Sequence, residues 1–119
     1  MTKISLEDLT RQLTAFRDAR DWKQFHGLKN LIVSLNLESA ELLELTQWLS
    51  DTDVEEKLQD DAFRARLSDE VADVFLYLLL ICARADIDVV AAAEAKIARN
   101  EERYPVEKSK GNAKKYTAL

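Results

Sequence analysis

Glycine, proline, cysteine and histidine are all scarce in this chain. Its 119 residues hold two glycines, one proline, one cysteine and one histidine. One cysteine, Cys82, excludes a disulfide framework, and the apolar run around it predicts a buried, reduced thiol. One histidine, His26, nearly excludes a di-iron carboxylate bundle, which needs Glu-x-x-His motifs on two helices. The sequence therefore argues against a disulfide-stabilised fold and against a di-iron centre.

Long hydrophobic runs and an excess of positive charge are also missing. The most apolar segment, residues 71–85, is too short to span a bilayer and contains Asp73. The N-terminal residues hold no apolar core of a signal peptide, so we expect a cytoplasmic protein without a membrane partner. The formal net charge of −5 disfavours a nucleic acid polymer as a partner but allows a small anion that a metal neutralises.

Helix-forming residues make up much of what is present. Leu, Ala, Glu, Lys and Arg are plentiful, and with so few turn-forming residues this composition is typical of a helical bundle. A chain of 119 residues is long enough for one domain with its own core. We therefore expect an all-α fold, a compact four-helix bundle, in a single domain over residues 1–119 with a basic tail at 106–119.

Apolar residues recur at helical spacing in four segments. The predicted helices cover residues 6–19, residues 29–49, a segment that starts between 60 and 68 and ends at 85, and residues 89–103. Ser5 and Asp88 are suited to cap the first and the last of them, and Pro105 stops the last. The pattern breaks over residues 50–53, where Thr52 with Glu55 is suited to cap a short helical piece.

Residues 71–81 are apolar on nearly every side of the third predicted helix, with Asp73 as the exception. A helix that is hydrophobic on all faces is buried on all faces. A chain of 119 residues has little else with which to surround such a helix. We therefore expect a homo-oligomer, a dimer or a larger assembly.

Two pairs of acidic residues stand inside these apolar segments, Glu38 with Glu41 and Glu70 with Asp73. Positions i and i+3 share a helix face about 5–6 Å apart, so each pair presents two carboxylates side by side. Carboxylates directed into a bundle repel one another and lose hydration unless a cation lies between them. An all-oxygen set suits Mg²⁺, with Mn²⁺ as a substitute, better than zinc. The alternative is an ordinary solvated acidic face.

Aromatic residues lie near the two ends of the second predicted helix: Trp22 and Phe25 beside His26, and Trp48. Aromatic faces can stack on a nucleobase, worth about 1–3 kcal/mol per base, with His26 hydrogen-bonding to the ring edge. In isolation, however, two tryptophans at helix ends are more often plugs of the core, and a lone histidine is more often structural. The residues alone leave both interpretations open.

The last predicted helix carries Lys96 and Asn100 one turn apart. They form either a polar surface or a cation and an amide directed at phosphate or sugar oxygens. The tail beyond Pro105 has an excess of lysine. It is either a frayed, solvated end or a segment that folds over an anionic ligand.

Five stretches of the chain carry motifs that occur together in one enzyme family. They are Arg-Asp-Trp-Lys-Gln-Phe-His at 20–26, Glu-Ser-Ala-Glu-Leu-Leu-Glu-Leu-Thr-Gln-Trp at 38–48, Glu-Val-Ala-Asp-Val-Phe-Leu-Tyr at 70–77, Lys-Ile-Ala-Arg-Asn-Glu-Glu-Arg-Tyr-Pro at 96–105 and Lys-Gly-Asn-Ala-Lys-Lys-Tyr at 110–116. Together they resemble the MazG-like all-α nucleoside triphosphate pyrophosphohydrolases, in particular the dCTP pyrophosphatase branch. The likeness runs from Phe16 to Leu119 and includes the family's metal motif, E-x-x-E and then E-x-x-D after a spacer of 28 residues. Leu28 and Thr46 depart from the family pattern, which has proline and an aromatic residue there.

The resemblance implies a helical bundle assembled as a dimer of dimers, with active sites at subunit contacts. It implies that Mg²⁺ is held by four carboxylates, those of Glu38, Glu41, Glu70 and Asp73. It further implies that a pyrimidine base lies among Trp22, Phe25, His26 and Trp48, and that sugar or phosphate groups contact Tyr77, Lys96 and Asn100.

The expected reaction is hydrolysis of a nucleoside triphosphate between its α and β phosphates, which yields a monophosphate and pyrophosphate. Phosphoryl chemistry needs charge neutralisation and in-line placement more than covalent help. We expect Glu41 or Glu38 to orient or deprotonate the attacking water. The expected substrate is dCTP or a modified pyrimidine triphosphate, removed to clean the nucleotide pool. The alternatives are a broader NTP or dUTP hydrolase, a phosphoribosyl-ATP pyrophosphatase, or a non-enzymatic helical module whose acidic seam binds a basic partner.

Overall fold

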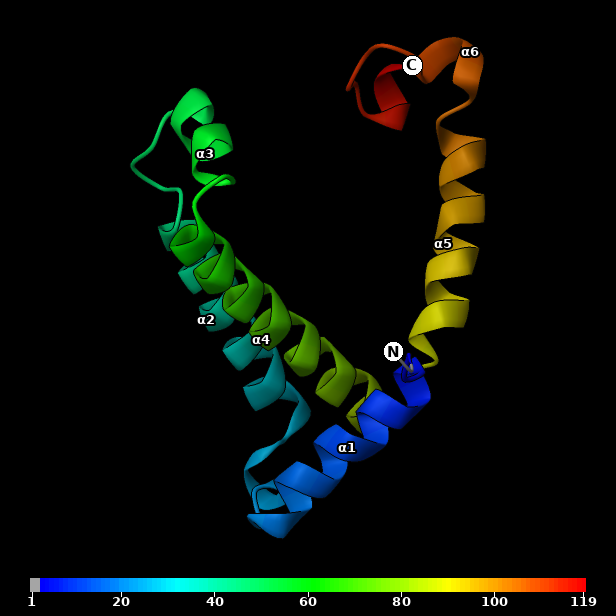
Figure 1. The fold of residues 1–119 in the computed structure, drawn as a ribbon. Helices are drawn as coiled ribbons and strands as arrows, with labels where there is room; N and C mark the ends of the chain where they lie inside the picture. Colours follow the sequence, from blue (N-terminus) through cyan, green and yellow to red (C-terminus); the bar gives the residue numbers. More distant parts are fainter. Residues whose placement is uncertain (1–2) are drawn as a thin grey trace. The chain divides into compact units, whose positions relative to one another are not determined.

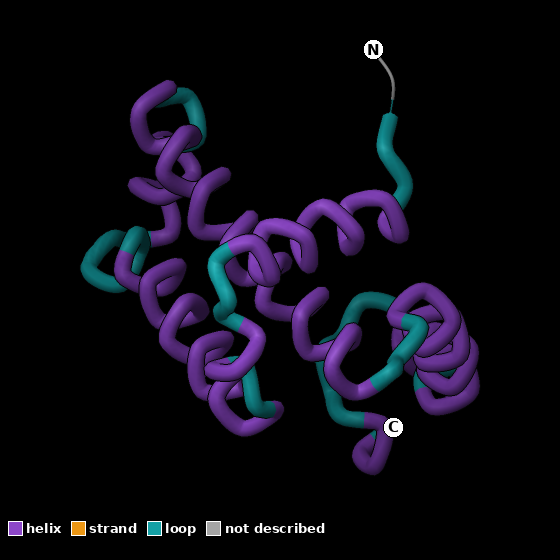
Figure 2. The backbone as a smooth tube through the Cα atoms, turned by 90° about the horizontal axis from the view of Figure 1, so that it is seen from below, coloured by secondary structure: helices purple, strands orange, loops and turns teal. Residues whose placement is uncertain are grey.

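The computed structural model describes residues 3–119 as helices joined by loops (Figures 1 and 2). The elements are α1 (Leu6–Ala19), η1 (Lys23–Phe25), α2 (Leu28–Glu44), α3 (Asp51–Lys57), α4 (Asp61–Ala85), α5 (Val89–Arg103), α6 (Val106–Ser109) and η2 (Tyr116–Ala118), where η marks a 3-10 helix. Within residues 3–119 there is no β-strand, so the all-α prediction is confirmed. None of the helices described is both long enough and apolar enough to cross a membrane.

The chain divides into two compact units, one that ends at Asp86 and one that begins at Ile87. In the first unit, α2 and α4 lie side by side, and α1 also packs against α4 (Figure 1). The buried hydrophobic side chains in the described part of this unit are few: Leu31, Phe63, Leu79 and Leu80. The pairing of α2 with α4 is the contact that places the two predicted acidic motifs opposite each other.

The second unit is built around α5. Asp88 caps this helix, since its Oδ1 accepts a hydrogen bond from the Ala91 amide at 3.1 Å, and the helix ends at Arg103 as predicted. Beyond it, the ring of Tyr116 meets that of Tyr104 edge to face, with centroids 6.1 Å apart, and lies 4.8 Å from the Arg103 guanidinium. The basic tail is therefore folded back onto the end of α5 by aromatic contacts.

Short polar side chains cap the helices of the first unit. Ser5 caps α1 as predicted, with its Oγ accepting from the Asp8 amide at 3.0 Å. The prediction of Thr52 as the cap of α3 is wrong, because Ser50 accepts from the Asp53 amide at 3.1 Å. Ser50 has the extended backbone of a capping residue (φ −73°, ψ 161°), whereas Thr52 already lies inside the helix.

Helix α2 ends at Glu44, short of the predicted end at residue 49. The amides of Leu45 and Thr46 bond to carbonyls three residues back, at 3.3 and 3.0 Å, which is how a helix tightens as it ends. Trp48 therefore lies outside the helix, and it is 87% exposed. It is not a plug of the core formed by this chain.

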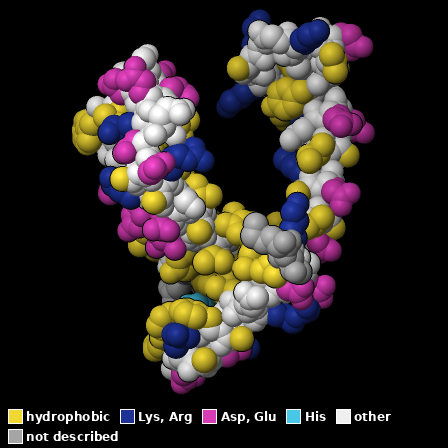
Figure 3. Space-filling model, in the orientation of Figure 1, with side chains coloured by type: hydrophobic (Ala, Val, Ile, Leu, Met, Phe, Trp, Pro, Cys, Tyr) yellow, Lys and Arg dark blue, Asp and Glu magenta, His cyan; other side chains and the backbone are white. Residues whose placement is uncertain are grey.

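Helix α4 keeps much of its apolar surface uncovered. Val71, Phe75 and Leu78 share one helix face and are 50%, 40% and 40% exposed. Figure 3 shows hydrophobic side chains gathered over α4 and α1 in the first unit. Within a single copy, the expectation that residues 71–81 are buried on every side is therefore not met. Cys82 is a free thiol, as predicted, but it is half-buried rather than buried.

Candidate metal centre and adjoining cavity

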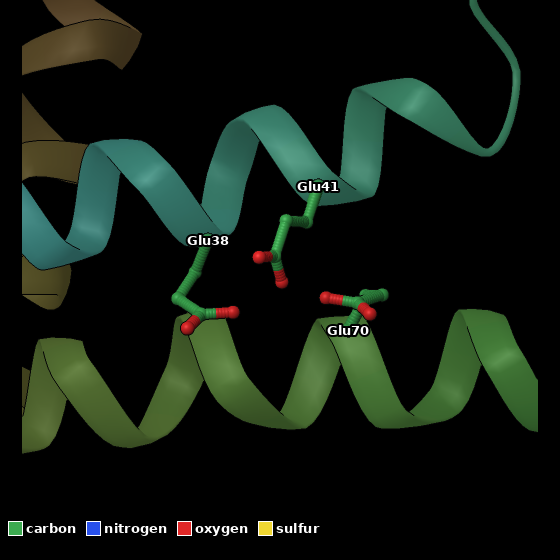
Figure 4. A group of neighbouring side chains, drawn as sticks. All are labelled: Glu38, Glu41 and Glu70. Atoms are coloured by element: carbon green, nitrogen blue, oxygen red, sulfur yellow. The ribbon is translucent and has the colours of Figure 1, made fainter.

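Three glutamates from two neighbouring helices point toward one another: Glu38 and Glu41 on α2, and Glu70 on α4 (Figure 4). One carboxylate oxygen of each lies within 4.8 Å of those of the others. The i, i+3 spacing puts Glu38 and Glu41 on the same face of α2, and α4 brings Glu70 up to that face. Converging carboxylate oxygens are the ligands that Mg²⁺ and Mn²⁺ prefer.

The group carries negative charge without positive compensation. Oε2 of Glu38 and Oε2 of Glu70 are shielded from solvent and make no hydrogen bond. Burial raises the pKa of Glu38, and the carboxylates of Glu41, Asp73 and Glu70 raise it further. Burial also raises the pKa of Glu70, and the charges of Glu41 and Asp73 add to the effect. No lysine or arginine of residues 3–119 forms an ion pair with these four acids. The donor set therefore fits a bound divalent cation.

Asp73, the fourth predicted ligand, lies one turn beyond Glu70 on α4 and outside the converging group of three. Its charge nonetheless contributes to the raised pKa of Glu38 and of Glu70, so it lies close to both. It also lines a cavity next to the carboxylates. Its role as a metal ligand stays a prediction.

That cavity has a volume of about 140 Å³ and an aromatic wall. It brings together Trp22, His26 and Tyr77, three of the predicted substrate-binding residues, with Asp73 on the side of the carboxylates. Nδ1 of His26 is shielded from solvent and has no hydrogen-bond partner. Burial lowers the pKa of His26, and the charge of Arg17 lowers it further, so the imidazole is neutral at physiological pH. A neutral imidazole can accept as well as donate a hydrogen bond.

The end of helix α1 fixes the position of Trp22. The Trp22 amide donates to the Arg17 carbonyl at 3.1 Å, and the Asp21 amide donates to the Asp18 carbonyl at 3.1 Å. This is the Schellman pattern, in which the residue at the position of Asp21 has a left-handed backbone, here with φ 55°. The Trp22 ring then meets that of Phe16 edge to face at 5.7 Å. Local backbone geometry therefore holds Trp22 at the cavity.

Five residues that line the cavity were not among the predicted site residues: Leu13, Phe16, Arg17, Leu76 and Leu80. Leu13 and Phe16 belong to an apolar stripe at helical spacing in residues 6–19, and Leu76 and Leu80 belong to the apolar segment 71–85. Neither pattern gave a reason to separate cavity wall from core. Arg17 has only one signal in the sequence, its place next to that stripe. Which face of α1 borders a cavity depends on how α1 packs on α4. No local sequence pattern predicts that packing.

The other predicted substrate-binding residues lie elsewhere. Phe25 and Trp48 do not line this cavity, and they are 63% and 87% exposed. Lys96 and Asn100 are on α5 in the second unit. The role of each in binding substrate stays a prediction.

Comparison with known proteins gives consistent matches over most of the chain. The model of the MazG-like family matches residues 33–119, which include both acidic motifs. The mouse (Mus musculus) protein dCTP pyrophosphatase 1 is 43% identical over 115 residues, which cover 97% of this chain and 68% of that protein. The human (Homo sapiens) protein of the same name is 37% identical over the same shares of the two chains. A crystal structure of a pyrophosphatase from Archaeoglobus fulgidus DSM 4304 superposes with a TM-score of 0.79 at 38% identity, covering 88% of this chain and 96% of that one.

Proposed function

Because this chain belongs to the MazG-like family and is a hydrolase of the dCTP pyrophosphatase type, we propose that it cleaves dCTP, or a modified pyrimidine triphosphate, to the monophosphate and pyrophosphate. The observation that carries the proposal is the converging group of three glutamates, which has no cationic partner among the described residues. The aromatic cavity beside it supports a nucleotide as the ligand. A nucleoside triphosphate has a base for such a cavity and phosphates that need a cation.

We propose Mg²⁺ as that cation, with Mn²⁺ as a substitute. Glu38, Glu41 and Glu70 would hold it, with Asp73 as a fourth ligand. When bound, the metal neutralises charge on the phosphate oxygens. The fit rests on the two carboxylate oxygens without hydrogen bonds and on the raised pKa of Glu38 and of Glu70, both of which a cation would relieve.

We propose that the glutamates also activate the attacking water. Glu41 is the exposed member of the group and Glu38 is half-buried. In this proposal one of the two orients the water and accepts its proton. The water oxygen bonds to phosphorus as the bond between the α and β phosphates breaks, which releases pyrophosphate.

The aromatic cavity is the proposed site of the base. Trp22 and Tyr77 supply aromatic rings, and the neutral His26 can donate to or accept from the polar edge of a pyrimidine. A cavity of about 140 Å³ suits a single pyrimidine ring better than a whole nucleotide. The sugar and phosphates would then lie outside it, toward the carboxylates of the metal centre. The roles of Phe25 and Trp48 at the base, and of Lys96 and Asn100 at sugar or phosphate groups, stay predictions.

We further propose that the protein works as a homo-oligomer, a dimer or a dimer of dimers. The uncovered apolar face of α4, formed by Val71, Phe75 and Leu78, supports this assembly. A second copy that covers this face would supply the burial that one chain does not.

The test is pyrophosphate release from dCTP, dUTP, dTTP, dATP and phosphoribosyl-ATP, measured with Mg²⁺ and with EDTA. We expect dCTP to be the best substrate and EDTA to stop its turnover. Glu41→Gln should lower kcat by at least about 100-fold while keeping the helical content, because a ligand and proton acceptor is lost.

The matched control is Glu44→Gln, the same change one turn further along α2 and outside the converging group. It should keep near-native turnover. Release from dUTP or from all triphosphates would keep the mechanism and change the substrate. If no nucleotide were cleaved, the non-enzymatic helical module would be the better account.

A further inference from the structure

A second and larger cavity lies in the first unit, with a volume of about 660 Å³. This is within the range of ordinary ligand sites, about 300–1,000 Å³. Three cationic side chains line it, from three separate elements: Arg17 on α1, Lys23 on η1 and Arg84 on α4. It is called the basic cavity below. The carboxylates of the candidate metal centre do not line it.

Positive charge in the basic cavity exceeds negative charge. Asp18 is the one acidic residue that lines it, and it accepts a hydrogen bond from Nε of Arg17 at 2.9 Å. Within the described part of the chain, Lys23 and Arg84 form no ion pair. The protein as a whole has a net charge of −5, so the positive charge of this cavity is opposite in sign to that of the whole chain.

The burial of Arg17 distinguishes the basic cavity from an ordinary charged surface. Its side chain is only 12% exposed. An arginine stays protonated in proteins, so its nitrogens keep their need for acceptors. The bond to Asp18 uses Nε, and the two terminal nitrogens have no hydrogen-bond partner among residues 3–119. A largely buried arginine side chain whose terminal nitrogens make no hydrogen bond within the described chain is a strong donor for an oxyanion.

We infer that the basic cavity binds a phosphate-bearing anion, held by charge-assisted hydrogen bonds from Arg17, Lys23 and Arg84. Three cations from separate elements match an oxyanion that carries more than one charge and several acceptor oxygens. Because no carboxylates of the metal centre line the cavity, the anion binds here without a divalent cation. Arg17 and His26 line the aromatic cavity as well, so an anion bound here changes the charge at the wall of that cavity.

The test uses the whole chain in EDTA at constant ionic strength, so that no metal can bridge phosphate to the glutamates. His26 is the single histidine, so its imidazole NMR signals report on this wall without overlap from another histidine. Inorganic phosphate and pyrophosphate should each shift these signals saturably. Arg84→Gln and Lys23→Gln should each weaken binding roughly tenfold, the loss of one charged hydrogen bond.

Arg66→Gln is the matched control, because it makes the same change on α4 at an exposed residue outside the basic cavity. It should bind phosphate as the wild type does. Circular dichroism checks that all variants keep their helices. No saturable shift in the wild type, or equal loss of affinity in Arg66→Gln and Arg84→Gln, would overturn the inference.

A comparison of phosphate with dCMP identifies the source of the anion. Binding of dCMP counts only where Arg84→Gln weakens it, since Arg84 does not line the aromatic cavity. Equal affinities would identify free phosphate, and affinity at least tenfold higher for dCMP would identify a nucleotide. Neither metal nor turnover enters these titrations, so their outcome is independent of whether the chain hydrolyses dCTP.

Discussion

At the scale of the residue, Glu38 opposes folding when no metal is bound. Burial and neighbouring acids raise its pKa above the ordinary 4.5, so the folded protein binds this proton more tightly than the unfolded chain does. Its contribution to the free energy of unfolding therefore falls as pH rises from the ordinary pKa to the raised one. Below the ordinary pKa the cost is absent, and above the raised pKa it is fully present.

Replacing Glu38 with glutamine should remove this cost. We expect Glu38→Gln to be more stable than the wild type in EDTA near neutral pH, and the difference to shrink as pH falls toward about 4. Urea unfolding at a series of pH values measures it. The lowered pKa of His26 changes stability in the opposite direction, but it does so in both proteins and cancels in their difference.

Two further measurements sharpen this comparison. Glu44→Gln, outside the group, should show no gain that grows with pH. Saturating Mg²⁺ should remove the advantage of Glu38→Gln, because the wild-type carboxylates then have a cation. A difference between Glu38→Gln and the wild type that stayed constant from pH 4 to neutral would contradict the assigned electrostatics.

At the scale of the element, the end of α1 is a case where backbone conformation and residue type disagree. Asp21 occupies the left-handed position of the Schellman pattern, with φ 55°. Glycine is the usual residue there, because a side chain at that backbone conformation is strained. The helix still ends here because the Trp22 and Asp21 amides donate hydrogen bonds to the carbonyls of Arg17 and Asp18 in its last turn.

Asp21→Gly should therefore stabilise the protein, by about 0.5–1 kcal/mol in the free energy of unfolding. Asp21→Val should destabilise it by a similar amount, since a β-branched residue tolerates this conformation poorly. Chemical denaturation measures both. Asp69→Gly, in the middle of α4, is the control and should lose stability because its backbone is helical. Loss of stability in Asp21→Gly would show that the left-handed backbone carries no strain here.

At the scale of the whole molecule, the uncovered face of α4 governs the expected assembly. Phe75 is at the middle of this face, between Val71 and Leu78. Phe75→Lys should convert the wild-type oligomer to monomer, because a lysine at the interface would be buried without a charge partner. We expect the association to be at least about 100-fold weaker. Light scattering after size-exclusion chromatography measures the mass.

The control for this substitution is Ala65→Lys, at an exposed position of α4 away from the apolar face. It should leave the mass unchanged. A wild-type protein that is monomeric at micromolar concentration would contradict the assembly proposal. The proposed assembly, the single-domain organisation and the cytoplasmic location all stay predictions at this scale.

The all-α class and most helix boundaries could be predicted from local pattern alone. Helical periodicity and the caps Ser5 and Asp88 are encoded within a few neighbouring residues. The errors also had local causes: two hydroxyl residues compete at the start of α3, and the apolar pattern of α2 continues past its last helical residue, Glu44. Backbone conformation decides between such neighbours, and the residue types alone do not.

By itself, the sequence determined the helices, the two acidic pairs and their helical faces, because i, i+3 spacing is a property of one segment. Only the tertiary structure decided which carboxylates meet. The packing of α2 on α4 brings Glu70 to Glu38 and Glu41 and leaves Asp73 toward the aromatic cavity. Tertiary packing also placed Arg17 between the aromatic and basic cavities. The physical reason is that a cavity is the space between elements, so its walls depend on contacts between residues far apart in the chain.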